Sequence, residues 1–119
     1  MDSDQRAKIS QLLEAVVAAD GVIKPEERAF VRRAIERWKL PVPEAPQSLR
    51  SLGNATNALR TLEPEAQSRV LALLVDAATV DGEVDPREHA LLLAAAAALG
   101  IDATALEARI VRQLGAARG

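Results

Sequence analysis

Apolar residues recur every three or four positions along most of this chain, which is the period of an amphipathic helix. Five segments show the pattern clearly: 4–19, 25–39, 64–80, 86–99 and 103–116. No segment shows the sustained alternation of apolar and polar residues, bounded by hairpin turns, that is typical of a strand. The pattern therefore predicts an all-α protein.

Prolines and glycines mark where these helices should begin and end. A proline suits the first turn of a helix, where its missing N–H is not needed, and a glycine just beyond the last turn readily takes the left-handed conformation. The prolines at such starts are Pro25, Pro64 and Pro86, and the glycines after predicted ends are Gly21, Gly82 and Gly100. Asp102 is a predicted N-cap for the last helix.

The middle of the chain is less regular. Three prolines in 41–46 exclude a regular helix there, and 47–62 predicts two short helices, the second capped by Asn54. We therefore expect six or seven helices in one compact bundle. As a single domain it would comprise a first repeat (4–40), a linker with short helices (41–62), a second repeat (63–101) and a C-terminal helix (102–117).

An internal repeat supports this division. The stretch 81–88, Asp-Gly-Glu-Val-Asp-Pro-Arg-Glu, has a second copy at 20–27, Asp-Gly-Val-Ile-Lys-Pro-Glu-Glu, at an offset of 61 residues. Asp, Gly, a β-branched apolar residue, Pro and the final Glu are shared, and the flanking apolar residues match at the same offset. The chain thus resembles a duplicated helix–loop–helix with an acidic loop in each copy.

Composition narrows the possible chemistry. The 119 residues carry a net charge of −2, no cysteine, no tyrosine and one histidine, His89. These totals exclude disulfides, thiolate zinc sites and sites that need two histidines, and they give no bulk attraction for nucleic acid or an anionic membrane. The polar N-terminus predicts no signal peptide, and no apolar run is long enough to span a membrane. We expect a cytoplasmic location.

The acidic loops are the candidate metal sites. The second loop and its flank offer Asp81, Glu83, Asp85, Glu88 and His89, and the first offers Asp20 and Glu27. Carboxylate oxygens suit a hard divalent cation such as Ca²⁺, Mg²⁺ or Mn²⁺, and a histidine nitrogen also suits Zn²⁺. An EF-hand is excluded, because with the loop glycines at its sixth position the first and third positions are Ala77 and Thr79, or Val16 and Ala18. A structural alternative stays open: Asp85 and Glu88 have the form of a helix capping box.

One helix face is basic, with Arg28, Arg32, Arg33, Arg37 and Lys39 interleaved with glutamates. Such a face is usually solvated, although it can also dock an acidic partner or the acidic loop of a second subunit. Trp38 is interpreted as a core residue, since its partner in the repeat is Leu99. The run 94–98 of alanines is interpreted as close helix packing.

The duplicated loops and their helical flanks resemble the TerB-like family of bacterial tellurite-resistance proteins. The segment 76–88 is more similar to the family than 17–27, and we place the resemblance over roughly Ile9 to Leu114. It implies an all-helical, internally repeated domain without enzymatic activity that acts in stress response as a sensing or scaffolding unit. It also implies a metal-binding acidic patch at Asp20, Glu27, Asp81 and Glu88, from which Lys24 and Arg87 depart.

Three hypotheses follow. The first is a non-enzymatic TerB-like domain that binds a divalent cation or a protein partner through its acidic loops. The second is a structural interaction or dimerisation module whose acidic loops only cap helices. The third and least favoured is an enzyme with paired carboxylates at Asp81 and Glu88, because the sequence offers no further catalytic group near them.

Overall fold

The structure is a computed structural model that describes residues 3–19, 24–41, 57, 59–80 and 82–118. Within these ranges it has no strand and five helices: α1 (Ser3–Val17), α2 (Pro25–Trp38), α4 (Pro64–Thr79), α5 (Pro86–Ala98) and α6 (Ala103–Arg118). The all-α prediction is confirmed for the described residues, and each of these helices begins and ends within two residues of its predicted bounds.

The structure gives five helices over the described ranges, against the six or seven predicted for the whole chain. The two short helices expected within 47–62 fall mostly outside those ranges, so their existence stays a prediction. Among the described residues, no helix combines the length and the apolar character that crossing a membrane requires.

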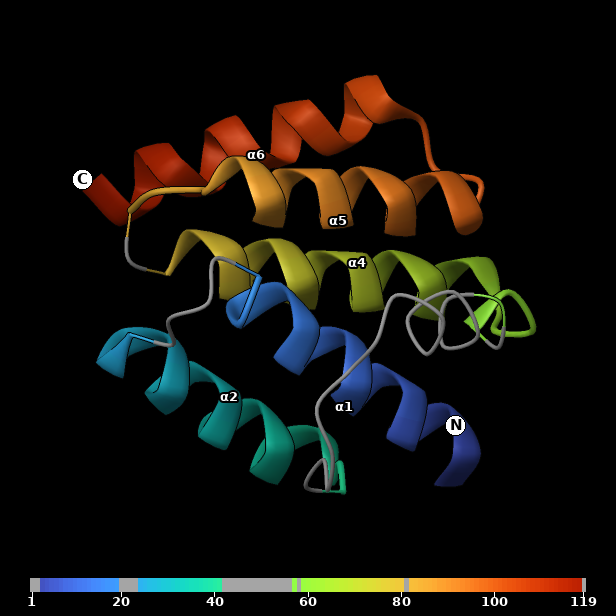
Figure 1. Ribbon diagram of the computed structural model, residues 1–119. Helices are drawn as coiled ribbons and strands as arrows, with labels where there is room; N and C mark the ends of the chain where they lie inside the picture. The colour runs from blue at the N-terminus through green and yellow to red at the C-terminus, as the bar shows by residue number, and fades with distance from the viewer. Residues whose placement is uncertain (1–2, 20–23, 42–56, 58, 81, 119) are drawn as a thin grey trace.

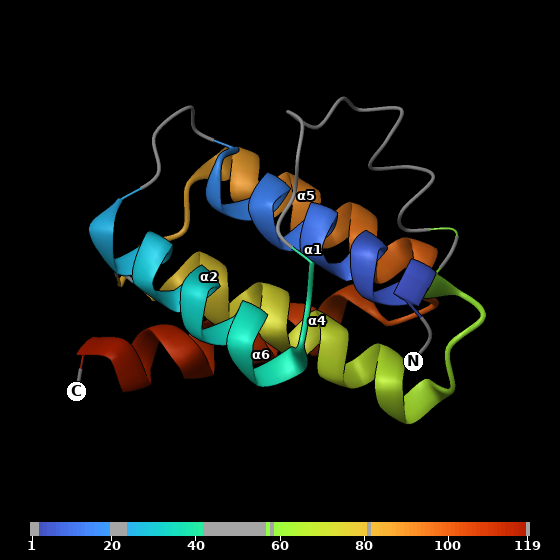
Figure 2. The ribbon, with the colours of Figure 1, turned by 90° about the horizontal axis from the view of Figure 1, so that it is seen from below.

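Helix α4 lies at the centre of the fold and contacts α1, α2, α5 and α6 (Figure 1). Its central place follows from its sequence, because apolar residues surround it on most sides. Seven of them are buried: Val70, Leu71, Leu73, Leu74, Val75, Ala77 and Ala78. Helix α1 packs on one side of α4 and runs in the same direction, whereas α2 and α5 run back the other way (Figures 1 and 2).

The core is almost entirely aliphatic. Its largest fully buried side chains come from α1, α4, α5 and α6 together with Leu59: Ile9, Leu13, Leu74, Leu92, Leu106, Val17, Val70 and Val75. Of the alanine run 94–98, only Ala95 and Ala96 are buried, while Ala94 and Ala97 are exposed. The close-packing interpretation therefore holds for just part of that run.

The C-terminal ends of α2 and α5 have the same backbone geometry. Lys39 and Gly100 both take the left-handed conformation, with φ of 55° and 74°. The following N–H then reaches back to a carbonyl of the helix, Leu40 N to Ile35 O at 2.9 Å and Ile101 N to Ala96 O at 2.8 Å. Such bonds satisfy carbonyls that a helix end leaves unpaired, and they fix where both helices stop.

Candidate functional site

The turn that leads into α5 forms a complete capping box, which confirms the capping interpretation of Asp85 and Glu88. Asp85 has an extended backbone, and its Oδ1 accepts a hydrogen bond from Arg87 N at 2.8 Å. In return Asp85 N donates to Glu88 Oε1 at 3.0 Å. Pro86 occupies the first helical position, where its lack of an N–H costs nothing. We call 85–88 the second capping turn.

The turn that leads into α2, residues 24–27, is the first capping turn and forms half of the same box. Lys24 N donates to Glu27 Oε1 at 3.0 Å, which matches the bond made by Glu88. The Lys24 side chain makes no capping hydrogen bond, because an ammonium group has no lone pair with which to accept one. Pro25 begins this helix as Pro86 begins the other.

Both capping glutamates are buried, with Glu27 exposing 2% and Glu88 exposing 4% of its surface. A buried carboxylate needs hydrogen bonds, and each of these accepts one from the backbone N–H of its N-cap residue. The positive end of the helix dipole also favours a negative charge at this position. Their burial and bonding therefore give Glu27 and Glu88 a structural role in starting α2 and α5.

The described members of the remaining predicted metal ligands have separate surroundings. Glu83 is exposed, and Asp85 forms an ion pair with Arg87 Nε at 3.5 Å. His89, on the first turn of α5, directs its Nε2 to a carboxylate oxygen of Glu107 on α6. Asp20 and Asp81 lie outside the described residues. Within the described part of the chain, no group of three or more His, Asp or Glu side chains is placed to hold a metal ion.

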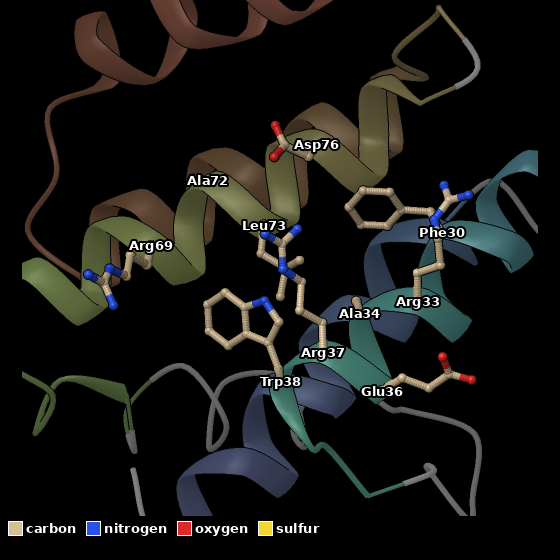
Figure 3. Close-up of a pocket in the computed structure, with 10 residues that line it drawn as sticks. All are labelled: Phe30, Arg33, Ala34, Glu36, Arg37, Trp38, Arg69, Ala72, Leu73 and Asp76. Carbon is tan, nitrogen blue, oxygen red and sulfur yellow. The ribbon is translucent and has the colours of Figure 1, made fainter.

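A groove of about 780 Å³ runs between α2 and α4 (Figure 3). We call it the α2–α4 groove, and it is lined by Phe30, Arg33, Ala34, Glu36, Arg37, Trp38, Arg69, Ala72, Leu73 and Asp76. Phe30, Arg37 and Trp38 extend from α2 toward α4 in Figure 3, whereas Asp76 points away from α2. Trp38 packs against the core but is only half-buried, so its interpretation as a core residue was incomplete.

The charges along this groove are unevenly balanced. Arg69 is paired with Glu65 at 3.0 Å on the exposed face of α4. Arg33 and Arg37 are exposed, and neither has an ion pair among the described residues. Like charges four residues apart on a helix repel by roughly 0.2–0.5 kcal/mol. The fold thus tolerates, at the edge of an apolar groove, two cations that have no ion pair in the described part of the chain.

Asp76 ends the groove on α4 and links it to α6. Its carboxylate accepts a hydrogen bond from Gln113 Nε2 and lies 3.9 Å from an Arg109 guanidinium nitrogen. Burial raises the pKa of Asp76 above its ordinary value of 3.8, while the bond from Gln113 and the charge of Arg109 act in the opposite direction. The neutral carboxyl form is therefore favoured more than it would be in water.

Comparison with known proteins decides the family. The family model described as "Tellurite resistance protein TerB" matches residues 43–110, which is more than half of the chain. The chain belongs to the TerB family. The matched region of this TerB-family protein contains α4, α5, the second capping turn and the first half of α6, whereas α1, α2 and the first capping turn precede it. No curated protein and no solved structure matches the chain.

The groove and Asp76 were missed when this TerB-family chain was interpreted from sequence alone. A groove depends on how two helices pack, and spacing along one helix does not reveal it. Asp76 did leave a signal, because it is an acidic residue inside an otherwise apolar stretch, between Leu73 and Ala77. A charge in such a place usually needs a partner from another element, and α6 provides it here.

Proposed function

We propose that this TerB-family domain is a non-enzymatic sensing or scaffolding module that binds another protein in its α2–α4 groove. One observation carries the proposal. The chain has only two aromatic residues, Phe30 and Trp38, and both line the groove and are half-buried. Aromatic side chains are enriched at protein interfaces, where they supply much contact area at a small cost in conformational entropy.

The groove supports a binding role better than a catalytic one. Its two carboxylates are Glu36, which is exposed, and Asp76, which is engaged by Gln113 of α6. The only histidine, His89, is not among the lining residues and is paired with Glu107. A general acid or base must be within hydrogen-bond reach of a bound substrate, and the groove presents mainly apolar groups and guanidinium groups instead.

The proposal includes an internal duplication, with α1–α2 and α4–α5 as two copies of one helix pair. Capping bonds at Glu27 and Glu88 recur at the 61-residue offset seen in the sequence. The left-handed residues Lys39 and Gly100 recur at the same offset. A role in stress response is part of the proposal and is supported by the family description alone.

Site-specific photo-crosslinking in cells tests the binding role. A photoreactive amino acid is placed at Ala72, inside the groove, and in a matched protein at Ala108, which is exposed on α6 and is not a lining residue. We expect crosslinks to a defined partner from Ala72 and not from Ala108. Crosslinking that is equal at both positions, or absent at Ala72, would contradict the proposal.

A divalent cation held by the acidic loops is a second candidate function. The observation in its favour is that the C-terminal ends of α1 and α4 and the N-terminal ends of α2 and α5 all lie at one end of the molecule (Figures 1 and 2). Carboxylates of Asp20, Asp81 and Glu83 follow those C-terminal ends in the sequence. A hard cation would take oxygen ligands from them, rather than the capping oxygens of Glu27 and Glu88.

Thermal unfolding distinguishes this candidate. The melting temperature is measured with a chelator and then with Ca²⁺, Mg²⁺, Mn²⁺ or Zn²⁺, for the wild type and for Asp20→Asn/Asp81→Asn. An ion bound only by the folded state raises the melting temperature of the wild type, and the double variant should lose that rise. A wild type whose melting temperature does not respond to any of these ions excludes the candidate.

A further inference from the structure

The α2–α4 groove has the shape of a site for a helix. Phe30, Ala34 and Trp38 lie one turn apart along α2 and face Ala72 and Leu73 of α4. From Phe30 to Trp38 the helix rises about 12 Å, which is enough for two or three anchoring side chains of a bound helix. Amphipathic helices bind such grooves with apolar residues at positions i, i+3 or i+4, and i+7.

The charges at the groove indicate which charge a bound helix should carry. Arg33 and Arg37 border the aromatic residues and have no ion pair among the described residues. The two carboxylates that line the groove are not directed at these arginines, because Asp76 points away from α2 and Glu36 points away from α4 (Figure 3). A guanidinium group forms its strongest hydrogen bonds with carboxylates, so the complementary partner is acidic.

Folding does not require cations at these positions. At the 61-residue offset, the positions of Arg33 and Arg37 correspond to Ala94 and Ala98 on α5. That helix has the same capping bond and the same left-handed residue at its end as α2. The same helix–turn geometry therefore forms with alanine at these positions, so the two arginines of α2 are available to an anionic ligand.

On the basis of the proposed interaction role, we infer that the α2–α4 groove binds an acidic amphipathic helix of a partner protein. Apolar side chains of that helix pack on Phe30, Trp38 and Leu73. Its carboxylates bind Arg33 and Arg37.

Trp38 reports on this binding without a label, because it is the only tryptophan and the chain has no tyrosine. The probe is a synthetic amphipathic peptide of about 16 residues, with leucines on one face and glutamates beside them. Matched peptides carry glutamine or lysine in place of every glutamate. We expect the glutamate peptide alone to shift the emission of Trp38 and to shield it from acrylamide, with weaker binding as salt is added.

Variants on α2 test the role of the arginines. Arg33→Ala/Arg37→Ala should lower the affinity for the glutamate peptide by roughly tenfold or more, as expected when charge-assisted hydrogen bonds are lost. Arg28→Ala/Arg32→Ala is the matched control, because it removes the same charge from exposed positions on the same helix that do not line the groove. This control should bind almost like the wild type.

Other outcomes overturn the inference in distinguishable ways. If the glutamate and glutamine peptides bind equally, and Arg33→Ala/Arg37→Ala changes neither affinity, the groove binds an apolar helix without regard to charge. The proposed interaction role is then retained. Concentration-dependent dimerisation that is lost in Arg33→Ala/Arg37→Ala means that the occupant is a second copy of the chain. No response of Trp38 to any peptide overturns the acidic helix, and crosslinking at Ala72 then decides separately whether the groove binds a protein.

Discussion

The two capping turns share one buried glutamate bond but differ at the N-cap. In the second turn, the side chain of Asp85 accepts a hydrogen bond from Arg87 N, whereas the side chain of Lys24 in the first turn has no atom that can accept one. Glu27 and Glu88 are nonetheless buried to a similar degree, and each accepts from the N-cap backbone at 3.0 Å. The glutamate half of a capping box can therefore form without a side-chain acceptor at the N-cap. The buried glutamate is what both helices retain.

The largest expected effect comes from removing that shared glutamate. Glu27→Ala and Glu88→Ala should each lower the free energy of unfolding by about 2 kcal/mol, because an N-cap N–H loses a charged acceptor in a poorly solvated place. Urea unfolding followed by circular dichroism gives both values. Glu88→Gln keeps an acceptor oxygen and should lose less.

Glu26→Ala is the matched control for this prediction, since Glu26 is an exposed neighbour of Glu27 in the first turn of α2. Its effect should stay within about 0.5 kcal/mol. A loss for Glu27→Ala no larger than for Glu26→Ala would mean that burial of this carboxylate contributes nothing to the start of α2.

The C-terminal ends of α2 and α5 offer a second comparison, because Lys39 and Gly100 share a positive φ. Gly100→Ala should destabilise by about 1 kcal/mol, since a side chain disfavours this conformation. A Cβ at this position would meet no atom within 4 Å, so steric contact adds nothing to the cost. Lys39→Gly should stabilise by about 0.5 kcal/mol for the converse reason.

Thermal unfolding of Gly100→Ala and Lys39→Gly should show a lower melting temperature for the first variant and a higher one for the second. Lys39→Ala serves as the control, because it removes the lysine side chain without relieving the backbone conformation. Equal melting temperatures for Lys39→Ala and Lys39→Gly would show that the left-handed backbone at Lys39 is not strained.

The N-cap difference gives the third prediction. Asp85→Ala should cost about 1 kcal/mol, because it removes the acceptor for Arg87 N. Lys24→Asp should add about 0.5 kcal/mol by completing the first box and placing a negative charge at the helix N-terminus. Urea unfolding measures both, with Lys24→Ala separating the new cap from the mere loss of a positive charge. A Lys24→Asp protein no more stable than Lys24→Ala would contradict this account of the first turn.

These comparisons also show what the sequence could reveal. Helix bounds were predictable because Pro25, Pro64 and Pro86 mark starts and Gly100 marks an end through local conformational preference. The capping box at Asp85 and Glu88 was predictable for the same reason. Lys39 shows where local preference stops being informative, since a lysine holds the left-handed conformation that glycine normally takes.

The candidate sites were harder to predict because they depend on packing between helices. His89 lies near Glu107 only because α6 packs on α5, and the basic residues of α2 border a groove only because α4 lies opposite. Sequence patterns indicated that His89 was a candidate metal ligand and that the basic residues of α2 formed a usually solvated face. From sequence, Glu27 and Glu88 could be interpreted as helix caps or as metal ligands. Only the fold shows that both are buried, with 2% and 4% of their surface exposed.

The smallest expected effect tests a difference between α1 and α4. Asp76 corresponds at the 61-residue offset to Ala15, which is buried in α1. Burial raises the pKa of Asp76 above 3.8, so between that value and the pKa of the folded state the folded protein binds more protons than the unfolded chain. The contribution of Asp76 to stability is thus fully present below pH 3.8 and declines as the pH rises through the folded pKa.

Asp76→Asn cannot titrate but keeps an oxygen that accepts from Gln113. Relative to the wild type, its free energy of unfolding should therefore rise as the pH increases through the folded pKa of Asp76 and level off above it. Urea unfolding at a series of pH values measures this difference, and Asp102→Asn, on an exposed cap of α6, supplies a control for general carboxylate effects. If the stability of Asp76→Asn relative to the wild type instead falls as the pH rises, the contacts with Arg109 and Gln113 lower the pKa of Asp76 more than burial raises it. The charged form of Asp76 would then stabilise the fold at a position where α1 has alanine.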